Sequence, residues 1–157
     1  MITNNAASRV VKIVGQDMVH PKITEKRTLT IVENCINAIK LQNMRILASY
    51  LGKDILFMVH KADRNKLLYV GIEKFFAGIG QLCGILQNDS ANIVWVIEDH
   101  KVAQLVIAPL KEARNAIAQA IVYTTEKDKI KKVTLFYGNT IPNTYRTITQ
   151  NLSIYEK

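Results

Sequence analysis

His60 is the residue of this 157-residue chain whose type and position best suit catalysis. It ends the segment Asp54 to His60, which is short, apolar and partly β-branched and is therefore typical of a strand. A neutral imidazole at the end of a strand could act as an acid or a base near pH 7. We therefore take His60 as the candidate catalytic residue. The simpler interpretation is a solvent-facing histidine, because the sequence offers no evident partner for it.

Other residue types that bind metals or act as nucleophiles are sparse. The three histidines are scattered, and the only two cysteines, Cys35 and Cys83, lie in helical apolar patterns without a CxxC motif. The sequence therefore predicts no metal site and no cofactor. Reduced core cysteines, the absence of a secretory leader and the absence of a long apolar run predict a cytoplasmic protein that does not bind membranes.

Charge is the most unusual bulk property of the chain. Lysine and arginine total 21 and aspartate and glutamate total 13, which gives a formal charge of +8. The basic residues are dispersed apart from one cluster, Lys127 to Lys132, and that cluster also contains Asp128. Aromatic residues make up only 7% of the chain and do not alternate with the basic ones. These features disfavour nucleic acid as a partner.

The apolar spacing before residue 60 predicts two helices. The first begins at the N-cap Thr24, and the second begins near Asn43 and is ended by Gly52. The apolar face of the first helix is formed by Val32, Cys35, Ile36 and Ile39. Residues 1–23 are an N-terminal extension, whose apolar part fits either a short helix or a strand.

The rest of the chain changes from helix to strand. A third helix begins near Gly71, after a turn or small hairpin at Lys61 to Lys66. From Asn92 onward we predict strands at 92–98, 102–110, 115–125 and 129–137. Helices followed by strands imply an α+β fold with an antiparallel sheet. We expect one domain over residues 24–142 and a C-terminal tail, 143–157, spaced like a docked helix.

Three local motifs resemble the nuclear transport factor two-like superfamily, which includes ketosteroid isomerase and SnoaL-like cyclases. They are the segment Ala48 to Phe57, the helix start Val70 to Phe76, and the turn Lys127 to Ile130, which looks like the family's Asp-Gly-Lys-Ile turn. The resemblance covers Glu25 to Asn139. It implies a cone-like, strongly curved antiparallel sheet packed on N-terminal helices.

The resemblance does not extend to the isomerase chemistry. Ketosteroid isomerase uses an Asp base, with a Tyr and a protonated Asp as hydrogen-bond donors. These positions fall on Val59, Cys35 and Ala120, so the base and the donors are missing. A shift of one residue in the alignment would place His60 at the base position.

The predicted strand 115–125 alternates between two faces, and the resemblance places the alanine face inside the cone. Small side chains there would leave room for a ligand. The predicted pocket is lined by Tyr50, Phe57, Val59, Phe75, Phe76, Trp95, Ala118, Ala120 and Val122. The alternative is a solid core, filled by the phenylalanines.

The opposite face of the same strand carries Ile117, Gln119, Ile121 and Tyr123. An apolar face of this kind usually marks an interface, so these residues are predicted to form a twofold homodimer. The alternative is that the C-terminal tail covers this face.

Together these features predict a small-molecule-binding protein with a largely apolar pocket, whose partner is a small apolar or amphipathic molecule. One alternative is an enzyme of the SnoaL-like cyclase, isomerase or dehydratase type that uses His60 as acid or base. Another is a protein–protein interaction module, acting through the sheet face or the basic cluster.

Overall fold

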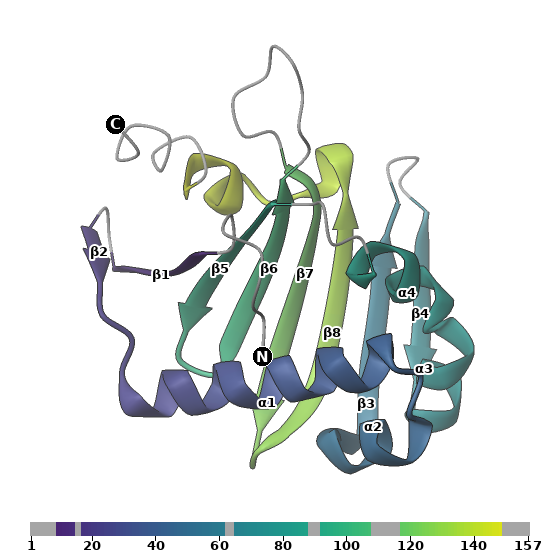
Figure 1. Ribbon diagram of the computed structural model, residues 1–157. Helices are drawn as coiled ribbons and strands as arrows, with labels where there is room; N and C mark the ends of the chain where they lie inside the picture. The colour runs from purple at the N-terminus through teal and green to yellow at the C-terminus, as the bar shows by residue number, and fades with distance from the viewer. Residues whose placement is uncertain (1–8, 15–16, 62–64, 88–91, 108–116, 149–157) are drawn as a thin grey trace.

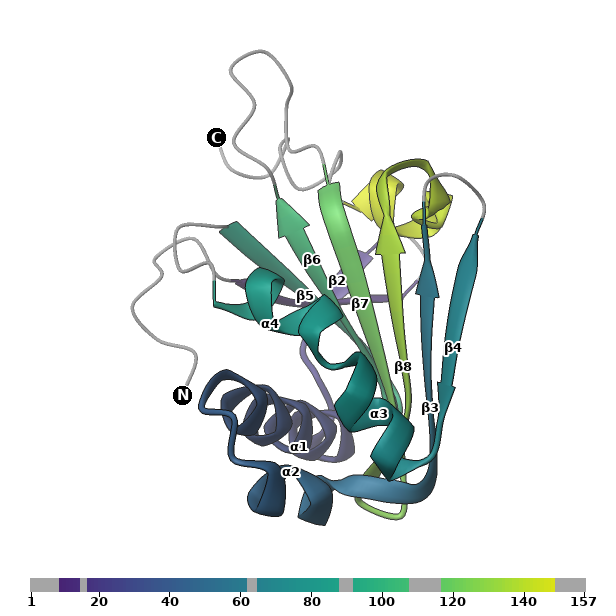
Figure 2. The same cartoon turned by 90° about the vertical axis from the view of Figure 1, so that its right-hand side faces the viewer.

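A curved sheet with helices on its inner side forms the frame of the protein (Figures 1 and 2). The computed structural model describes residues 9–14, 17–61, 65–87, 92–107 and 117–148. Within these ranges the sheet has eight strands in the order β2-β1-β5-β6-β7-β8-β3-β4. The strands are β1 Arg9–Val14, β2 Asp17–Val19, β3 Leu51–His60, β4 Lys66–Val70, β5 Asn92–Glu98, β6 Lys101–Ile107, β7 Ile117–Glu126 and β8 Lys129–Tyr137.

The sheet is mixed rather than purely antiparallel. β5, β6, β7 and β8 form an antiparallel meander, which confirms the four predicted strands within the described residues. β3 pairs in parallel with β8, and β1 pairs in parallel with β5. These two parallel pairs join segments far apart in sequence, a relation that the local pattern does not contain. The overall class is the predicted α+β fold with a curved sheet.

The helices lie mainly on the concave side of the sheet. They are α1 Ile23–Lys40, α2 Met44–Tyr50, α3 Ile72–Gly78 and α4 Gly80–Leu86. α1 crosses the sheet on this side (Figure 1) and buries the predicted apolar face. The expected third helix is thus two short helices. None of the helices in the described ranges has the length and apolar character of a membrane span.

Two predicted helix boundaries are wrong. α1 begins before Thr24, and its N-cap is Lys22, whose backbone N–H donates to Glu25 Oε1 over 2.8 Å. Gly52 does not end α2, because β3 already begins at Leu51. A Cβ on Gly52 would lie 3.3 Å from the carbonyl oxygen of Ile130, so glycine permits the close approach of β3 and β8. The predicted start of the second helix near Asn43 is confirmed, since α2 begins at Met44 and its N-cap Asn43 accepts from the Ile46 N–H through Oδ1.

Apolar residues are buried on both faces of the sheet. The helix-side core joins the helices to one face and includes Cys35, Phe57, Phe75, Ile121 and Tyr123. The outer core covers the other face and contains Val94, Val96, Ala103, Leu105, Ile107, Ala120, Val122, Ile141 and Ile148. Residues 143–148 are helical and lie within the tail expected to dock as a helix. The rest of that tail, 149–157, lies outside the described residues.

Candidate functional site

The predicted faces of β7 are reversed in the structure. Ile121 and Tyr123 lie in the helix-side core, whereas Ala120 and Val122 lie in the outer core. The alternation was correct, but the large side chains fill the space beneath the helices. The small ones lie where the segment at Ile141 and Ile148 packs onto the sheet.

This reversal moves several predicted pocket residues. Ala120 and Val122 do not line the concave side, and Ala118 lies where the pairing of β6 with β7 shifts register. The remaining residues join or pack against the helix-side core: Tyr50, Phe57, Val59, Phe75, Phe76 and Trp95.

The reversal also removes residues from the predicted dimer interface. Ile121 and Tyr123 are fully buried within the chain, so they are not available to a partner. Gln119 is half-buried, and Ile117 packs against the outer core. The competing expectation, that the C-terminal tail covers this face, is wrong for Ile121 and Tyr123, which pack with the helices. Ile148 of the tail packs in the outer core, on the opposite face.

An aromatic group fills one end of the helix-side core. The Phe57 ring stacks on Tyr69, with ring centroids 5.5 Å apart, and lies 5.4 Å from the ring of Phe75 in a tilted arrangement. Phe57 and Phe75 are both fully buried. This part of the predicted pocket is therefore solidly packed, as the alternative interpretation expected.

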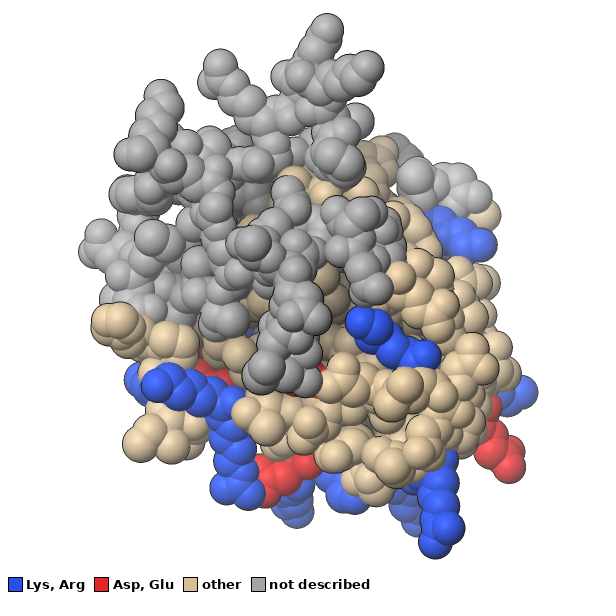
Figure 3. Space-filling view, in the orientation of Figure 1, with Lys and Arg blue, Asp and Glu red and all other residues tan. Residues whose placement is uncertain are grey.

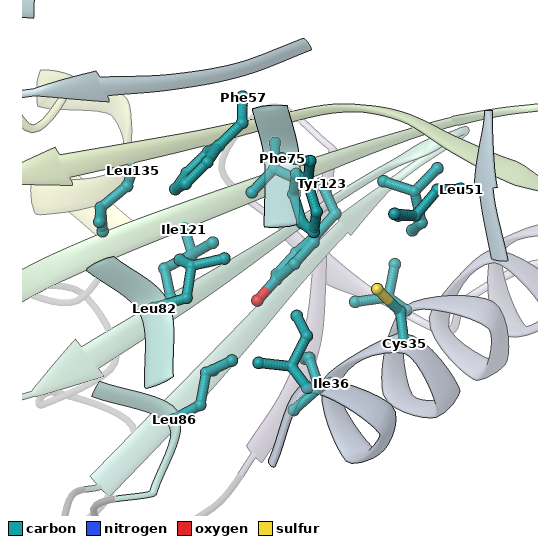
Figure 4. Packing of buried hydrophobic residues seen from close by; sticks show 14 of the residues in the cluster. Cys35, Ile36, Leu51, Phe57, Phe75, Leu82, Leu86, Ile121, Tyr123 and Leu135 are labelled. Carbon is teal, nitrogen blue, oxygen red and sulfur yellow. The ribbon is translucent and has the colours of Figure 1, made fainter. Parts of the chain in front are cut away.

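A hydrogen-bonded polar pair, Tyr123 and Gln104, lies on the helix side of the sheet. The Tyr123 hydroxyl on β7 donates to Gln104 Oε1 on β6 over 2.9 Å, and both side chains are buried. Burial, with a smaller contribution from Cys35, raises the pKa of Tyr123 well above 10, so its hydroxyl stays protonated. The tyrosine oxygen points toward the side where Ile36, Leu82 and Leu86 lie (Figure 4). The polar pair of Tyr123 and Gln104 therefore lies next to apolar side chains of the helices.

Gln104 is not among the residues predicted for the site, and Tyr123 was predicted on the opposite face. The usable signal was a glutamine in the middle of the apolar strand Lys101–Ile107. A polar residue inside such a segment needs a hydrogen-bonding partner once it is buried.

His60 lies on the face opposite this polar pair. Its neighbour Val59 belongs to the helix-side core, and the imidazole stacks on Phe136, whose side chain packs against the outer core. The two rings are 4.8 Å apart between centroids. Burial, and then the positive charges of Lys66 and Lys132, lower the pKa of His60 below 6.5. His60 is thus a neutral stacked side chain at pH 7 and lies away from the predicted pocket.

The basic cluster 127–132 surrounds the turn between β7 and β8. Lys127 and Asp128 both have positive φ, and Arg27 of α1 forms an ion pair with Asp128 over 2.5 Å. Lysine and arginine side chains project from the lower part of the molecule in Figure 3. Since both partners of this ion pair are more than half exposed, the pair adds little stability. No group of histidine, cysteine and carboxylate side chains suited to a metal ion occurs among the described residues.

No protein-family model and no curated protein sequence matches the chain. Solved structures do match it. An NTF2-like protein of unknown function from Mesorhizobium loti has a TM-score of 0.53 at 8% identity, covering 76% of this chain and 97% of that one. A protein from Kribbella flavida provisionally described as a ketosteroid isomerase has a TM-score of 0.51 at 10% identity, covering 75% and 82%.

A third structure comes from Xanthomonas campestris and is provisionally described as a polyketide cyclase. Its TM-score is 0.50 at 15% identity, and the match covers 74% of this chain and 93% of that one. Identities this low establish a shared fold and nothing finer.

Proposed function

We propose that this chain, which has the nuclear transport factor two-like fold, binds a small apolar or amphipathic molecule between its sheet and its helices. The observation that carries the proposal is the buried Tyr123–Gln104 hydrogen bond within an otherwise apolar face. Small-molecule sites are usually apolar, with a few polar groups that fix the orientation of the ligand. The helix-side core around Tyr123 has this composition.

The side chains of the helix-side core do not support catalysis of the isomerase type. Val59 and Cys35 stand where the isomerase has its base and one of its donors. Both are buried apolar members of the helix-side core. Burial raises the pKa of the Cys35 thiol to about 12, so it is a neutral thiol and not a base. His60 is on the other face. The chain is therefore proposed as a binding protein rather than as an enzyme that uses these groups.

The test is a titration with N-phenyl-1-naphthylamine, a neutral apolar dye that fluoresces when it leaves water. We expect saturable binding of one dye per chain. Ile121→Trp places a larger side chain beside Gln104, its partner across the β6–β7 pair, and should weaken binding at least about tenfold.

The matched control is Val122→Trp, one residue along β7 but in the outer core. It should change the affinity for the dye by less than about twofold. Circular dichroism would verify that both variants are folded. Absence of saturable binding to the wild type, or equal loss in the two variants, would reject this site.

We also propose a homodimer, formed through the outer side of β3 and β4 rather than through the residues of β7. Two apolar side chains on the edge strand β4 support it, since Leu68 is 56% and Val70 53% exposed. They pair with Met58 and Leu56 of β3, so the four side chains lie on one face and extend the apolar surface.

Sedimentation velocity tests this interface. Leu68→Lys should convert a wild-type dimer into a monomer, because it places a charge in the apolar contact. Leu41→Lys is the control, since Leu41 is 78% exposed but follows α1, away from β4. A monomeric wild type would contradict the proposal, and so would a Leu68→Lys variant that stays dimeric.

A further inference from the structure

We infer that the ligand presents a neutral hydrogen-bond-accepting oxygen, such as that of a ketone, ester or amide, to a donor cluster formed by Trp95, Gln104 and Tyr123. This inference rests on the proposed function, because it specifies which chemical group binds at that site. The observation behind it is that N–H donors of Trp95 and Gln104 are buried and have no hydrogen-bond acceptor in the described part of the chain.

The strand register brings the three side chains together. Trp95 on β5 and Gln104 on β6 are partners in the antiparallel pair, so their side chains leave the sheet on the same face about 5 Å apart. Gln104 faces Ile121 on its other side, and Tyr123 lies two residues along β7. The hydrogen bond from Tyr123 to Gln104 spans this diagonal. The cluster is therefore built on three adjacent central strands.

The donors exceed the acceptors in this cluster. Trp95 is 1% exposed and Gln104 is 3% exposed. Among the described residues, the bond to Tyr123 is the only hydrogen bond made by the side chain of Gln104, and the indole N–H of Trp95 makes none. Both amide hydrogens of Gln104 and the indole hydrogen are thus unused.

This count does not depend on how the amide is oriented. If the amide is turned over, its nitrogen donates to the tyrosine oxygen instead. The tyrosine hydroxyl, one amide hydrogen and the indole hydrogen are then unused. Buried donors without acceptors are uncommon, because each one forfeits its hydrogen bond to water. An acceptor supplied from outside the chain would satisfy them.

The surroundings favour a neutral acceptor over an anion. The buried polar residues of the described ranges are Glu25, Thr28, Gln104, Thr125 and Thr134, so no buried cation lies among them. A carboxylate or phosphate placed here would be an unpaired buried charge, which is strongly unfavourable. A carbonyl oxygen needs only the donors. The adjacent apolar side chains of Ile36, Leu82 and Leu86 suit an apolar body next to that oxygen (Figure 4).

Two probes of the same shape test the inference: cyclooctanone, and cyclooctane as its hydrocarbon counterpart. The chain has one tryptophan, so a ¹⁵N-labelled sample gives a single indole N–H resonance in a heteronuclear NMR spectrum. We expect the ketone to bind about tenfold more tightly than the hydrocarbon, since it gains hydrogen bonds to otherwise unused donors. We also expect the indole resonance to move downfield with the ketone only.

The double variant Gln104→Leu/Tyr123→Phe removes the polar pair without leaving either partner orphaned. It should bind cyclooctane as the wild type does and show a smaller preference for cyclooctanone, because only the indole N–H of Trp95 is left to donate. Thr134→Val is the control, because Thr134 is buried but faces the outer side, opposite Val122. This variant should keep the preference.

The outcomes separate the inference from the proposed function. If neither probe binds, the proposed function fails, and the inference fails with it. If both probes bind equally well to the wild type, the binding function stands and the inference is overturned. A preference for the ketone that is undiminished in the double variant overturns it too. A ketone that binds without moving the indole resonance also overturns it, because the donors are then satisfied by another group such as a buried water.

Discussion

Replacing Glu25 by alanine is expected to lower the free energy of unfolding by about 3 kcal/mol. Glu25 lies in the first turn of α1 and is fully buried. Its two carboxylate oxygens accept from the backbone N–H groups of Lys22, over 2.8 Å, and Asp99, over 2.9 Å. One side chain therefore joins the start of α1 to the turn between β5 and β6.

The size of the effect follows from what alanine would leave behind. Both N–H groups would lose a charged acceptor in a partly buried place, and hydrogen bonds to charged groups are the stronger kind. The negative charge near the N-terminus of α1 would also be lost. Asp99 has a φ of 51°, so its turn would lose a hydrogen bond that helps to hold this uncommon conformation.

Urea unfolding followed by circular dichroism measures the loss. Glu73→Ala is the matched control, since Glu73 is the exposed acid in the first turn of α3. We expect it to change stability by less than about 0.5 kcal/mol. Glu25→Gln keeps an acceptor oxygen, so its loss of stability should lie between those of Glu25→Ala and Glu73→Ala. A Glu25→Ala variant as stable as the control would mean that water replaces the carboxylate, contrary to its burial.

The second large effect is expected at Gly78, the last residue of α3. A Cβ built there would lie 2.8 Å from two ring atoms of Tyr69. That ring stacks on Phe57, which in turn contacts Phe75, so it has little room to retreat. We expect Gly78→Ala to lower stability by about 2 kcal/mol, because overpacking outweighs the gain in helix propensity.

Gly84 provides the matched comparison with the opposite sign. It lies in α4, and a Cβ built there meets no atom within 4 Å. Gly84→Ala should therefore raise stability by about 0.5 to 1 kcal/mol through helix propensity and reduced freedom of the unfolded chain. Thermal unfolding of the two variants checks the signs. Two changes of the same sign would show that contact with Tyr69 does not govern position 78.

Local patterns in the sequence predicted those elements whose residues interact mainly with close neighbours. The apolar face of α1 and the strands of the meander are of this kind, because hydrophobic spacing and hairpin connections are local properties. The apolar pattern of the N-terminal segment fits a helix and a strand equally well. Its identity as β1 depends on pairing with β5, which is distant in sequence.

The faces of β7 show why local alternation was insufficient for the candidate site. Both faces of this strand are buried, one by helices and the other by the C-terminal segment, so both sets of side chains are apolar. Alternation separates the two sets but does not say which one meets the helices. The burial of Glu25 was missed for a related reason. An acid in the first turn of a helix usually remains in water, and its partner Asp99 lies far along the chain.

The parallel pairing of β3 with β8 has a consequence for synthesis of the protein. Phe57 pairs with Val133, so most of the chain must leave the ribosome before β3 has its partner on that side. Until then the β3–β4 hairpin has a free edge, and the aromatic group of Phe57, Tyr69 and Phe75 has nothing of β8 beside it. Unpaired strand edges and exposed apolar surface are where nascent chains aggregate. The interval between the emergence of β3 and that of β8 is therefore when this chain most needs a chaperone.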